Sequence, residues 1–166
     1  MTPDSSRPSA VPGGAGDAQG VQVHGTVVAI GGVGGVGVLL RGPSGCGKSD
    51  LALRLIDGGA ALVADDRADI RCVEGALIAT PPPAIAGRME VRGIGIVEID
   101  TVPRARLGLL IDLVPAARIA RIPDATSEDV LGITLPLIAV TPFEASAAAK
   151  VRLAAARAGG GIMGRP

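Results

Sequence analysis

The chain has 166 residues, which suffices for one domain with a hydrophobic core, since single domains usually span about 100–200 residues. Acidic and basic residues balance at 16 each, so the chain carries no net positive charge that would attract nucleic acid. Phe143 is the only Phe, Tyr or Trp residue, so the chain offers no series of rings on which successive bases could stack. These features together argue against nucleic acid as a partner.

The cysteine count and the hydropathy pattern favour a cytoplasmic protein. Cys46 and Cys72 are too few for a disulfide framework, so a reducing compartment is the simpler interpretation. No stretch approaches the roughly 20 unbroken apolar residues of a membrane helix, and no membrane insertion is expected. Residues 1–19 lack the apolar core of a signal peptide and are rich in Pro, Gly, Ser and Ala, which predicts a disordered tail.

The elements in chain order predict one α/β domain over residues 20–158, with a frayed tail over 159–166. Strands are expected at 26–30, 36–41, 60–64, 68–73, 76–79, 89–99, 107–114 and 133–140. The glycine-rich turn between the first two strands predicts a hairpin. One helix is expected to end at about Asp57, and another to span 145–158 after Thr141-Pro142 opens it. Many strands and few helices favour a mixed β-sheet with helices packed on it over a regular parallel Rossmann sheet.

One segment fits the phosphate-binding pattern G-x-x-x-x-G-K-[ST] without a gap; it consists of Gly42, Pro43, Ser44, Gly45, Cys46, Gly47, Lys48 and Ser49. In such a P-loop the glycines let backbone N–H groups close around phosphate oxygens, Lys48 reaches the β- and γ-phosphates, and the Ser49 hydroxyl ligates Mg²⁺. An apolar strand leads in and a helix leads out, so the positive end of the helix faces the anion. The chain contains no asparagine and so lacks the Asn-Lys-x-Asp motif of GTPases, which favours ATP over GTP.

Phosphoryl transfer also needs a group that handles the proton of the attacking hydroxyl. Asp65-Asp66 follows a short apolar strand, where one acid can hold Mg²⁺ or its waters while the other accepts the proton. The alternative is a pair of turn residues that cap the next element of the chain. Asp112 also follows an apolar run and is a rival candidate for the acid that holds Mg²⁺. The residues after it are apolar as well, which favours a structural role or a place at the edge of the sheet.

His24 and the pair formed by Glu90 and Arg92 are further candidates. His24 is the only histidine, and a lone histidine is more often structural than catalytic, although its place before the strand that feeds the P-loop makes proximity feasible. Glu90 and Arg92 flank Val91, so on a strand both side chains would face the same side. Such a pair suits a metal ligand beside a phosphate-binding arginine, and it suits a surface ion pair equally well.

Four segments together resemble the C-terminal catalytic domain of HPr kinase/phosphorylase. They are Val23-His24-Gly25, the P-loop, residues 62–69 (Leu-Val-Ala-Asp-Asp-Arg-Ala-Asp) and residues 90–96 (Glu-Val-Arg-Gly-Ile-Gly-Ile). The last two segments are far more specific than the P-loop. The resemblance implies a fold related to phosphoenolpyruvate carboxykinase, assembly as a homo-oligomer (a hexamer), and ATP-dependent phosphorylation of a serine on the phosphocarrier protein HPr. It also implies the reverse reaction, phosphorolysis of the phosphoserine, in the same active site.

The resemblance further implies a role for each matching residue. Asp66 would be the general base for the serine hydroxyl, and the general acid in the reverse direction, with Asp65 and His24 in support. The P-loop would bind the phosphates through its lysine, and its serine would hold Mg²⁺ together with Glu90.

The chain departs from the family pattern in several respects, which include extra glycine between His24 and Gly42 and a shortened segment after Ile99. We expect a short, truncated form without the family's separate N-terminal domain, and residues 138–144 (Ile-Ala-Val-Thr-Pro-Phe-Glu) stand where the family has Gly-Arg-Asn. Arg118 and Arg121 are the candidates for a catalytic arginine of the family. Three functions stay open: a kinase for an HPr-like protein, which the motifs favour, a small-molecule kinase on the same scaffold, and a nucleotide-sensing module without turnover.

Overall fold

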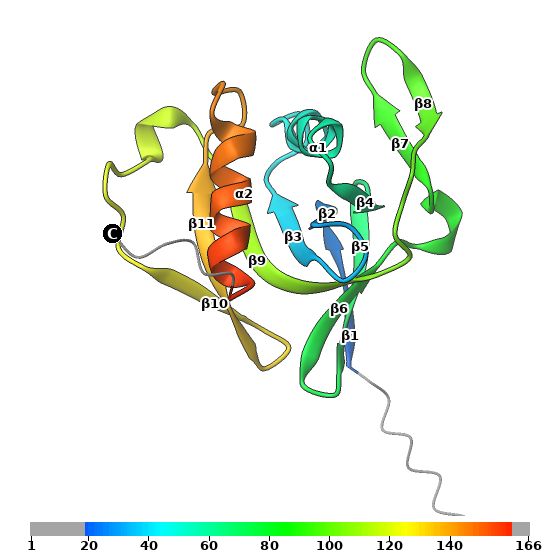
Figure 1. Ribbon diagram of the computed structural model, residues 1–166, viewed down its shortest axis with the longest axis horizontal. Helices are drawn as coiled ribbons and strands as arrows, with labels where there is room; N and C mark the ends of the chain where they lie inside the picture. Colours follow the sequence, from blue (N-terminus) through cyan, green and yellow to red (C-terminus); the bar gives the residue numbers. More distant parts are fainter. Residues whose placement is uncertain (1–18, 161–166) are drawn as a thin grey trace, which may run out of the picture.

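The computed structural model describes residues 19–160 (Figure 1). The tails expected at 1–19 and 159–166 lie outside this range except for Gln19, Gly159 and Gly160, so disorder there stays a prediction. The Gly159 N–H donates to the carbonyl of Ala155 and ends the last helix. Within the described residues, no helix is long and apolar enough to cross a membrane.

The helices of the described range are α1 (Lys48–Asp57) and α2 (Ala147–Ala158), with short 3-10 turns η1 (Pro83–Ile85) and η2 (Ala116–Arg118). Its strands are β1 (Gly20–His24), β2 (Thr26–Ile30), β3 (Val36–Arg41), β4 (Ala61–Ala64), β5 (Arg67–Val73), β6 (Ala76–Thr80), β7 (Arg88–Val91), β8 (Gly95–Glu98), β9 (Ala105–Leu113), β10 (Thr126–Val130) and β11 (Ile133–Val140).

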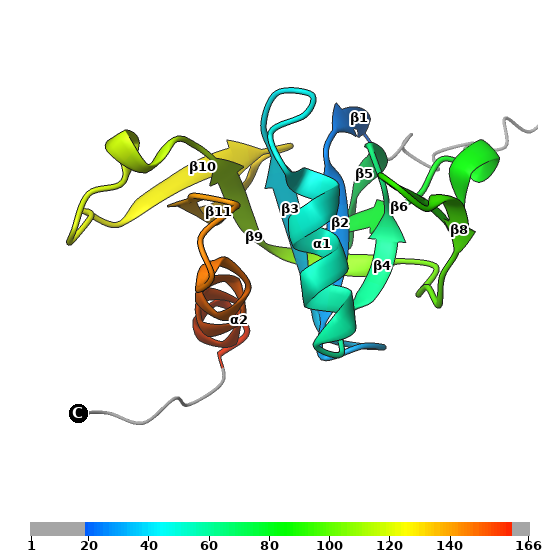
Figure 2. The same cartoon turned by 90° about the horizontal axis from the view of Figure 1, so that it is seen from above.

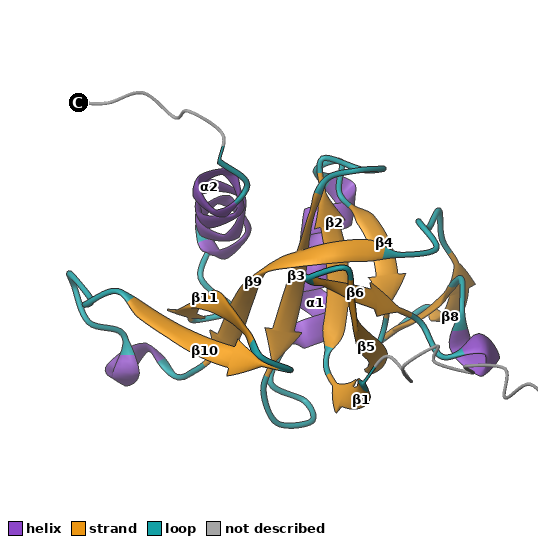
Figure 3. Cartoon of the chain, turned by 90° about the horizontal axis from the view of Figure 1, so that it is seen from below, coloured by secondary structure: helices purple, strands orange, loops and turns teal. Residues whose placement is uncertain are grey.

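Nine strands of the described range form one mixed sheet, which Figure 3 shows from below. Its main path runs β1-β5-β6-β9-β3-β2-β4, and β11 adds to β9 with β10 on its far side. The long strand β9 pairs in parallel with β3 and β11, whereas the other neighbours pair antiparallel. The strands β7 and β8 form a separate antiparallel hairpin. This is the expected α/β fold with a mixed sheet and packed helices.

One hydrophobic cluster fixes both helices on the same face of the sheet (Figure 2). Leu51 and Leu55 of α1 and Val151 of α2 are fully buried against Val28 and Leu40 of the sheet. Burial of one such leucine contributes roughly 1.5–3 kcal/mol to stability. Because α1 is anchored in this way, the loop that precedes it is anchored as well.

A second cluster lies on the opposite face, because side chains alternate between the two faces along a strand. Val27 and Leu39 belong to this cluster, although Val28 and Leu40, their neighbours in β2 and β3, belong to the first. No helix residue contributes to the second cluster among the described residues; β5 and β6 cover this face through buried residues such as Ile70. The central strands are therefore apolar on both sides, as their sequences suggest.

The predicted elements are largely confirmed, with four corrections. The strand β1 covers residues 20–24, where no strand was expected. Residues 89–99 are two strands rather than one, because residues 92–94 form a turn and Gly93 and Gly95 adopt positive φ angles of 89° and 114°. The strand β10 was not expected, since its sequence Thr-Ser-Glu-Asp-Val is mostly polar. The second helix begins at Ala147 after Ser146, so Thr141-Pro142 precedes the helix without opening it.

Candidate active site

The P-loop connects the end of β3 to α1, and its backbone geometry depends on glycine. Gly45 and Gly47 have positive φ angles of 78° and 105°, which L side chains rarely adopt. Gly47 also stands directly before the helix, where its carbonyl accepts a hydrogen bond of 2.9 Å from the N–H of Leu51. The free N–H groups at this end of α1 form a cradle for an anion.

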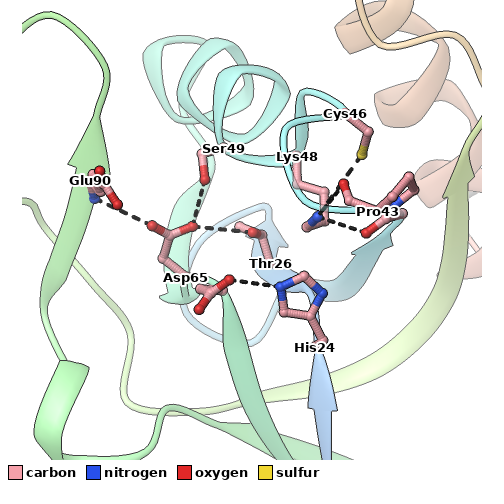
Figure 4. Close-up of polar contacts among 10 residues, drawn as sticks. His24, Thr26, Pro43, Cys46, Lys48, Ser49, Asp65 and Glu90 are labelled. Atoms are coloured by element: carbon pink, nitrogen blue, oxygen red, sulfur yellow. Dashed lines mark hydrogen bonds and ion pairs between the residues drawn. The ribbon is translucent and has the colours of Figure 1, made fainter.

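Lys48 is the buried cation of the loop, with 7% of its surface exposed. Its Nζ donates to the carbonyl oxygens of Gly42, at 2.7 Å, and Pro43, at 3.0 Å (Figure 4). The Sγ of Cys46 lies at 3.9 Å from the same nitrogen. The ammonium group therefore closes the loop on itself and places positive charge inside the cradle.

Asp65 joins the end of β4 to the P-loop. Its Oδ1 accepts hydrogen bonds from Ser49 Oγ at 2.8 Å and from Thr26 Oγ1 at 3.1 Å, and its Oδ2 accepts one from the Glu90 N–H at 3.3 Å (Figure 4). Only 8% of Asp65 is exposed. A carboxylate so buried is tolerated because these donors replace the water that it has lost.

Asp66 and His24 form the exposed part of the site. His24 Nε2 lies 2.8 Å from Asp66 Oδ1, and 48% and 64% of the two side chains are exposed. The pairing of β1 with β5 sets His24 opposite Arg67, next to Asp66. At Gly25 a Cβ would lie 2.7 Å from the Leu40 carbonyl oxygen, so only glycine lets the chain turn from His24 into β2.

The backbone of Asp66 has a φ of 65°, which is uncommon for a residue other than glycine. Its carbonyl accepts a hydrogen bond of 2.8 Å from the Gly25 N–H, and Arg67 N–H donates to the Asp65 carbonyl at 2.7 Å. These bonds hold a conformation that costs free energy, and such strain gathers at functional sites. As a result, the two neighbouring aspartates point in different directions, one toward the P-loop and the other toward His24.

Glu90 and Arg92 do not share a strand face. Glu90 contacts Asp65 through its main-chain N–H, and its side chain is exposed on β7. Arg92 lies in the turn after Val91, and no side-chain hydrogen bond or ion pair of Arg92 is found within residues 19–160. The expectation of a shared face is wrong because the predicted strand is interrupted at this turn. The roles of both residues stay predictions.

Asp112, the rival to Asp65, is bonded to Arg41 of β3, whereas Ser49 is bonded to Asp65. The Oδ1 of Asp112 accepts a hydrogen bond of 2.8 Å from Arg41 Nε, while the Arg41 NH groups donate to both oxygens of Glu128 at 2.7 and 2.8 Å. The hydrogen bonds from Arg41 lower the pKa of Glu128, and the two acids raise the pKa of Arg41. This network links β3, β9 and β10. Arg118 ends η2 and Arg121 follows it, and both side chains are exposed.

Three residues that contact the site, Thr26, Arg54 and Phe143, belong to no sequence motif. Thr26 is fully buried at the start of β2, and it is a polar residue in an otherwise apolar strand, which is the only signal that could have found it. Arg54 of α1 donates to the carbonyl oxygens of Pro142 and Glu144, and thereby fastens residues 141–146 beside the P-loop. Phe143 itself lies against the loop at Gly47, where an added Cβ would be 2.9 Å from the ring.

The residues present suit a bound nucleotide and Mg²⁺. The cradle at α1 and the buried Lys48 suit a polyphosphate. No group of three or more His, Cys, Asp and Glu side chains within residues 19–160 could hold a metal ion by itself. Mg²⁺ commonly binds through one or two carboxylates together with substrate phosphates. The oxygens of Ser49, Asp65 and Glu90 are the donors that such an ion would use here.

The buried Lys48 closes the loop, and Ser49 is hydrogen-bonded to Asp65 after β4. A loop of this form is typical of P-loop proteins, which bind phosphate groups. The sequence profile of the HPr serine kinase C-terminal domain matches residues 17–148. The chain therefore belongs to the HPr serine kinase C-terminal domain family.

Individual relatives agree with this assignment. The HPr kinase/phosphorylase of Clostridium tetani is 45% identical over 80 residues, which are 48% of this chain and 25% of that protein. The corresponding protein of Clostridium beijerinckii is 44% identical over 80 residues, or 48% of this chain and 26% of its own length. The chain thus matches about a quarter of these curated relatives. The structure of the HPr(Ser) kinase/phosphatase from Coxiella burnetii superposes with a TM-score of 0.68 at 29% identity, covering 81% of this chain and 85% of that one.

Proposed function

We propose that this protein is an ATP-dependent protein serine kinase that phosphorylates an HPr-like phosphocarrier protein in the cytoplasm and also catalyses phosphorolysis of the phosphoserine. One observation carries the proposal. Two adjacent aspartates follow β4; one is hydrogen-bonded to the P-loop serine, while the other lies exposed beside His24. The names of the relatives, HPr kinase/phosphorylase, support the choice of acceptor.

The chemistry divides between the two aspartates. In the forward reaction the oxygen of the acceptor serine bonds to the γ-phosphorus of ATP, while the bond from that phosphorus to the β,γ-bridging oxygen breaks and ADP leaves. Asp66 receives the proton of the hydroxyl. In phosphorolysis an oxygen of inorganic phosphate bonds to the phosphorus of the phosphoserine while the bond from that phosphorus to the serine oxygen breaks. Asp66 then returns its proton to the serine oxygen, and pyrophosphate leaves. A base that is 64% exposed is accessible to a serine on the surface of another protein.

His24 and Asp65 position the reacting groups. His24 orients the Asp66 carboxylate through the 2.8 Å contact. Asp65 holds the Ser49 hydroxyl, and with Glu90 it lies where a metal bound to the phosphates would be coordinated. Bound Mg²⁺ would neutralise charge on the phosphates. Lys48 and the backbone N–H groups of the loop, with Arg92 from the neighbouring turn, would bind the phosphates themselves.

The proposal is tested by incubating the purified chain with labelled ATP, Mg²⁺ and an HPr protein, and locating the phosphate by mass spectrometry. The Asp66→Asn variant is expected to lose transfer by roughly 10²–10⁴-fold, the usual contribution of a general base. Asparagine tolerates positive φ, so the backbone at this position is preserved. ATP affinity, measured by calorimetry, should change little.

Asp69→Asn is the matched control. Asp69 lies on β5, the strand that follows Asp66, and it accepts a hydrogen bond of 3.0 Å from Gln22 of β1. Its substitution should leave transfer unchanged. Transfer to small hydroxyl compounds but not to HPr would replace the proposed acceptor. ATP binding without transfer to either would replace the kinase by a nucleotide sensor.

A further inference from the structure

An exposed aromatic ring lies beside the P-loop. Phe143 is the only Phe, Tyr or Trp of the chain, and 69% of it is exposed. Its ring lies against the loop: a Cβ added at Gly47 would be 2.9 Å from Phe143 Cζ and 3.1 Å from Pro142 Cβ. A large apolar side chain left in water calls for an explanation when it borders a ligand site.

The ring is held in place rather than left loose on a surface loop. Arg54 of α1 donates to the carbonyl oxygens on both sides of it, those of Pro142 and Glu144. Glu144 in turn accepts a hydrogen bond of 2.6 Å from Lys150 of α2. The segment is thus bound to α1 through its backbone and to α2 through the Glu144 side chain, while the ring itself is exposed next to the loop.

The order of the strands places the ring and the acids on opposite sides of the P-loop. The local order is β11-β9-β3-β2-β4, and the loop leaves β3 in the middle. Asp65 and Asp66 follow β4 on one flank, whereas Phe143 follows β11 on the other. Figure 1 shows the segment that precedes α2 beside α1 and the end of β3.

This arrangement matches the two ends of a nucleoside triphosphate. The γ-phosphate must face the proton acceptor, and so it lies toward Asp66. The base lies at the other end of the molecule and leaves the cradle on the flank of Phe143. We propose that Phe143 is the platform on which the adenine ring of ATP stacks. This inference rests on the proposed function, because it takes ATP as the ligand of the P-loop.

The experiment compares two ligands that share the phosphates and differ in the base, Mg·ATP and Mg·tripolyphosphate. Both are titrated calorimetrically into the wild type and into Phe143→Ala. Stacking of a base on an aromatic side chain accounts for roughly a 5- to 150-fold loss of affinity on truncation to alanine. Phe143→Ala should weaken ATP binding by such a factor and leave tripolyphosphate binding unchanged. Phe143→Leu, which keeps apolar bulk without a π face, should lose most of the same affinity.

Phe143→Trp provides a second readout. The chain contains no other tryptophan or tyrosine, so this residue would be the sole strong fluorophore. Affinity for ATP should be retained, and ATP should quench the emission while tripolyphosphate should not. Val33→Ala is the matched control, since Val33 is 89% exposed at the turn between β2 and β3 and its truncation should not affect either ligand.

Each other outcome is decisive. Equal weakening of both ligands in Phe143→Ala would show that the ring only supports the loop, and would overturn the inference while leaving the kinase in place. Unchanged ATP affinity in Phe143→Ala, or no quenching by ATP in Phe143→Trp, would overturn it in the same way. A wild type that binds neither ligand would overturn the proposed function, and this inference with it.

Discussion

Ser49 Oγ and Asp65 Oδ1 lie 2.8 Å apart, so the last residue of the P-loop is hydrogen-bonded to the first residue after β4. This contact connects two segments that are separated by 16 positions in the sequence. It sets the hydroxyl beside a carboxylate, two oxygen donors of the kind that the proposed phosphate-bound Mg²⁺ would use. The coupling between loop and strand therefore leads directly to a prediction about metal dependence.

Ser49→Ala should remove most of the gain in ATP affinity that Mg²⁺ provides. Loss of an outer-shell partner alone reduces metal affinity by roughly 10–100-fold, and loss of a direct ligand should cost at least as much. The measurement is ATP titration with and without Mg²⁺. Ser127→Ala, at an exposed position of β10, serves as control and should retain the full effect. Equal Mg²⁺ dependence in Ser49→Ala and wild type would contradict the assigned role.

Two buried threonine hydroxyls should respond to the same substitution with opposite signs. Thr26 is fully buried and donates to Asp65, so Thr26→Val would leave a buried carboxylate short of a donor and destabilise the fold by roughly 1.5–3 kcal/mol. The Thr141 hydroxyl oxygen is buried and finds no hydrogen-bond partner among the described residues. Thr141→Val should therefore stabilise the protein, by about 1 kcal/mol.

Urea unfolding of the two variants, followed by circular dichroism, measures both effects. Because the chemical change is the same, the difference in side-chain volume largely cancels between them, although Thr26 lies in β2 and Thr141 follows β11. Destabilisation of similar size in both variants would mean that the hydroxyl of Thr141 is satisfied in solution.

The contrast between these two threonines also shows which features of the site a sequence can indicate. The P-loop and Asp65-Asp66 were predicted because each is a continuous pattern whose chemistry depends on neighbours in the chain. The partner of Thr26 is 39 positions away, and the partners of Arg54 are 88 and 90 positions away. No local pattern encodes such contacts, which depend on how the sheet brings β2, β4 and β11 together.

The errors have similar causes. Residues 89–99 read as one strand because their apolar content outweighed Gly93 and Gly95, whose positive φ angles form the turn. The strand β10 escaped prediction because its stability comes from β11 and from the Arg41–Glu128 ion pair rather than from its own apolar residues. Its turn did carry a signal: Asp129 accepts a hydrogen bond from the Gly132 N–H after Leu131, and both Leu131 and Gly132 have positive φ.

Acid should weaken the attachment of β10 through Glu128. Hydrogen bonds from Arg41 hold the folded pKa of Glu128 below its ordinary value of 4.5. The stabilising contribution of the pair is therefore complete above that value, and it is lost as the pH falls through the folded pKa. Arg41 stays protonated throughout, because Glu128 and Asp112 raise its pKa.

Glu128→Gln isolates this contribution, since glutamine does not titrate. The variant should unfold at a lower temperature than the wild type at pH 7, and the difference should shrink as the pH falls below about 4.5. Glu128 is 40% exposed, so solvent screens the pair and the difference will be modest. A difference in melting temperature that stays constant down to acidic pH would show that the pair contributes through packing rather than charge.

His24 should affect catalysis only through Asp66. His24→Gln removes the ring that contacts Asp66 Oδ1 at 2.8 Å, and this leaves the carboxylate free to rotate into solvent. Transfer to HPr should fall, by less than the roughly 10²–10⁴-fold expected for Asp66→Asn, because the base itself remains. Residues that act as a unit are strongly non-additive, so adding His24→Gln to Asp66→Asn should cost little more. Single-turnover rates for the wild type, both variants and the double variant complete the cycle. Additive effects would mean that His24 contacts the acceptor or the nucleotide directly, and that its role is independent of the aspartate beside it.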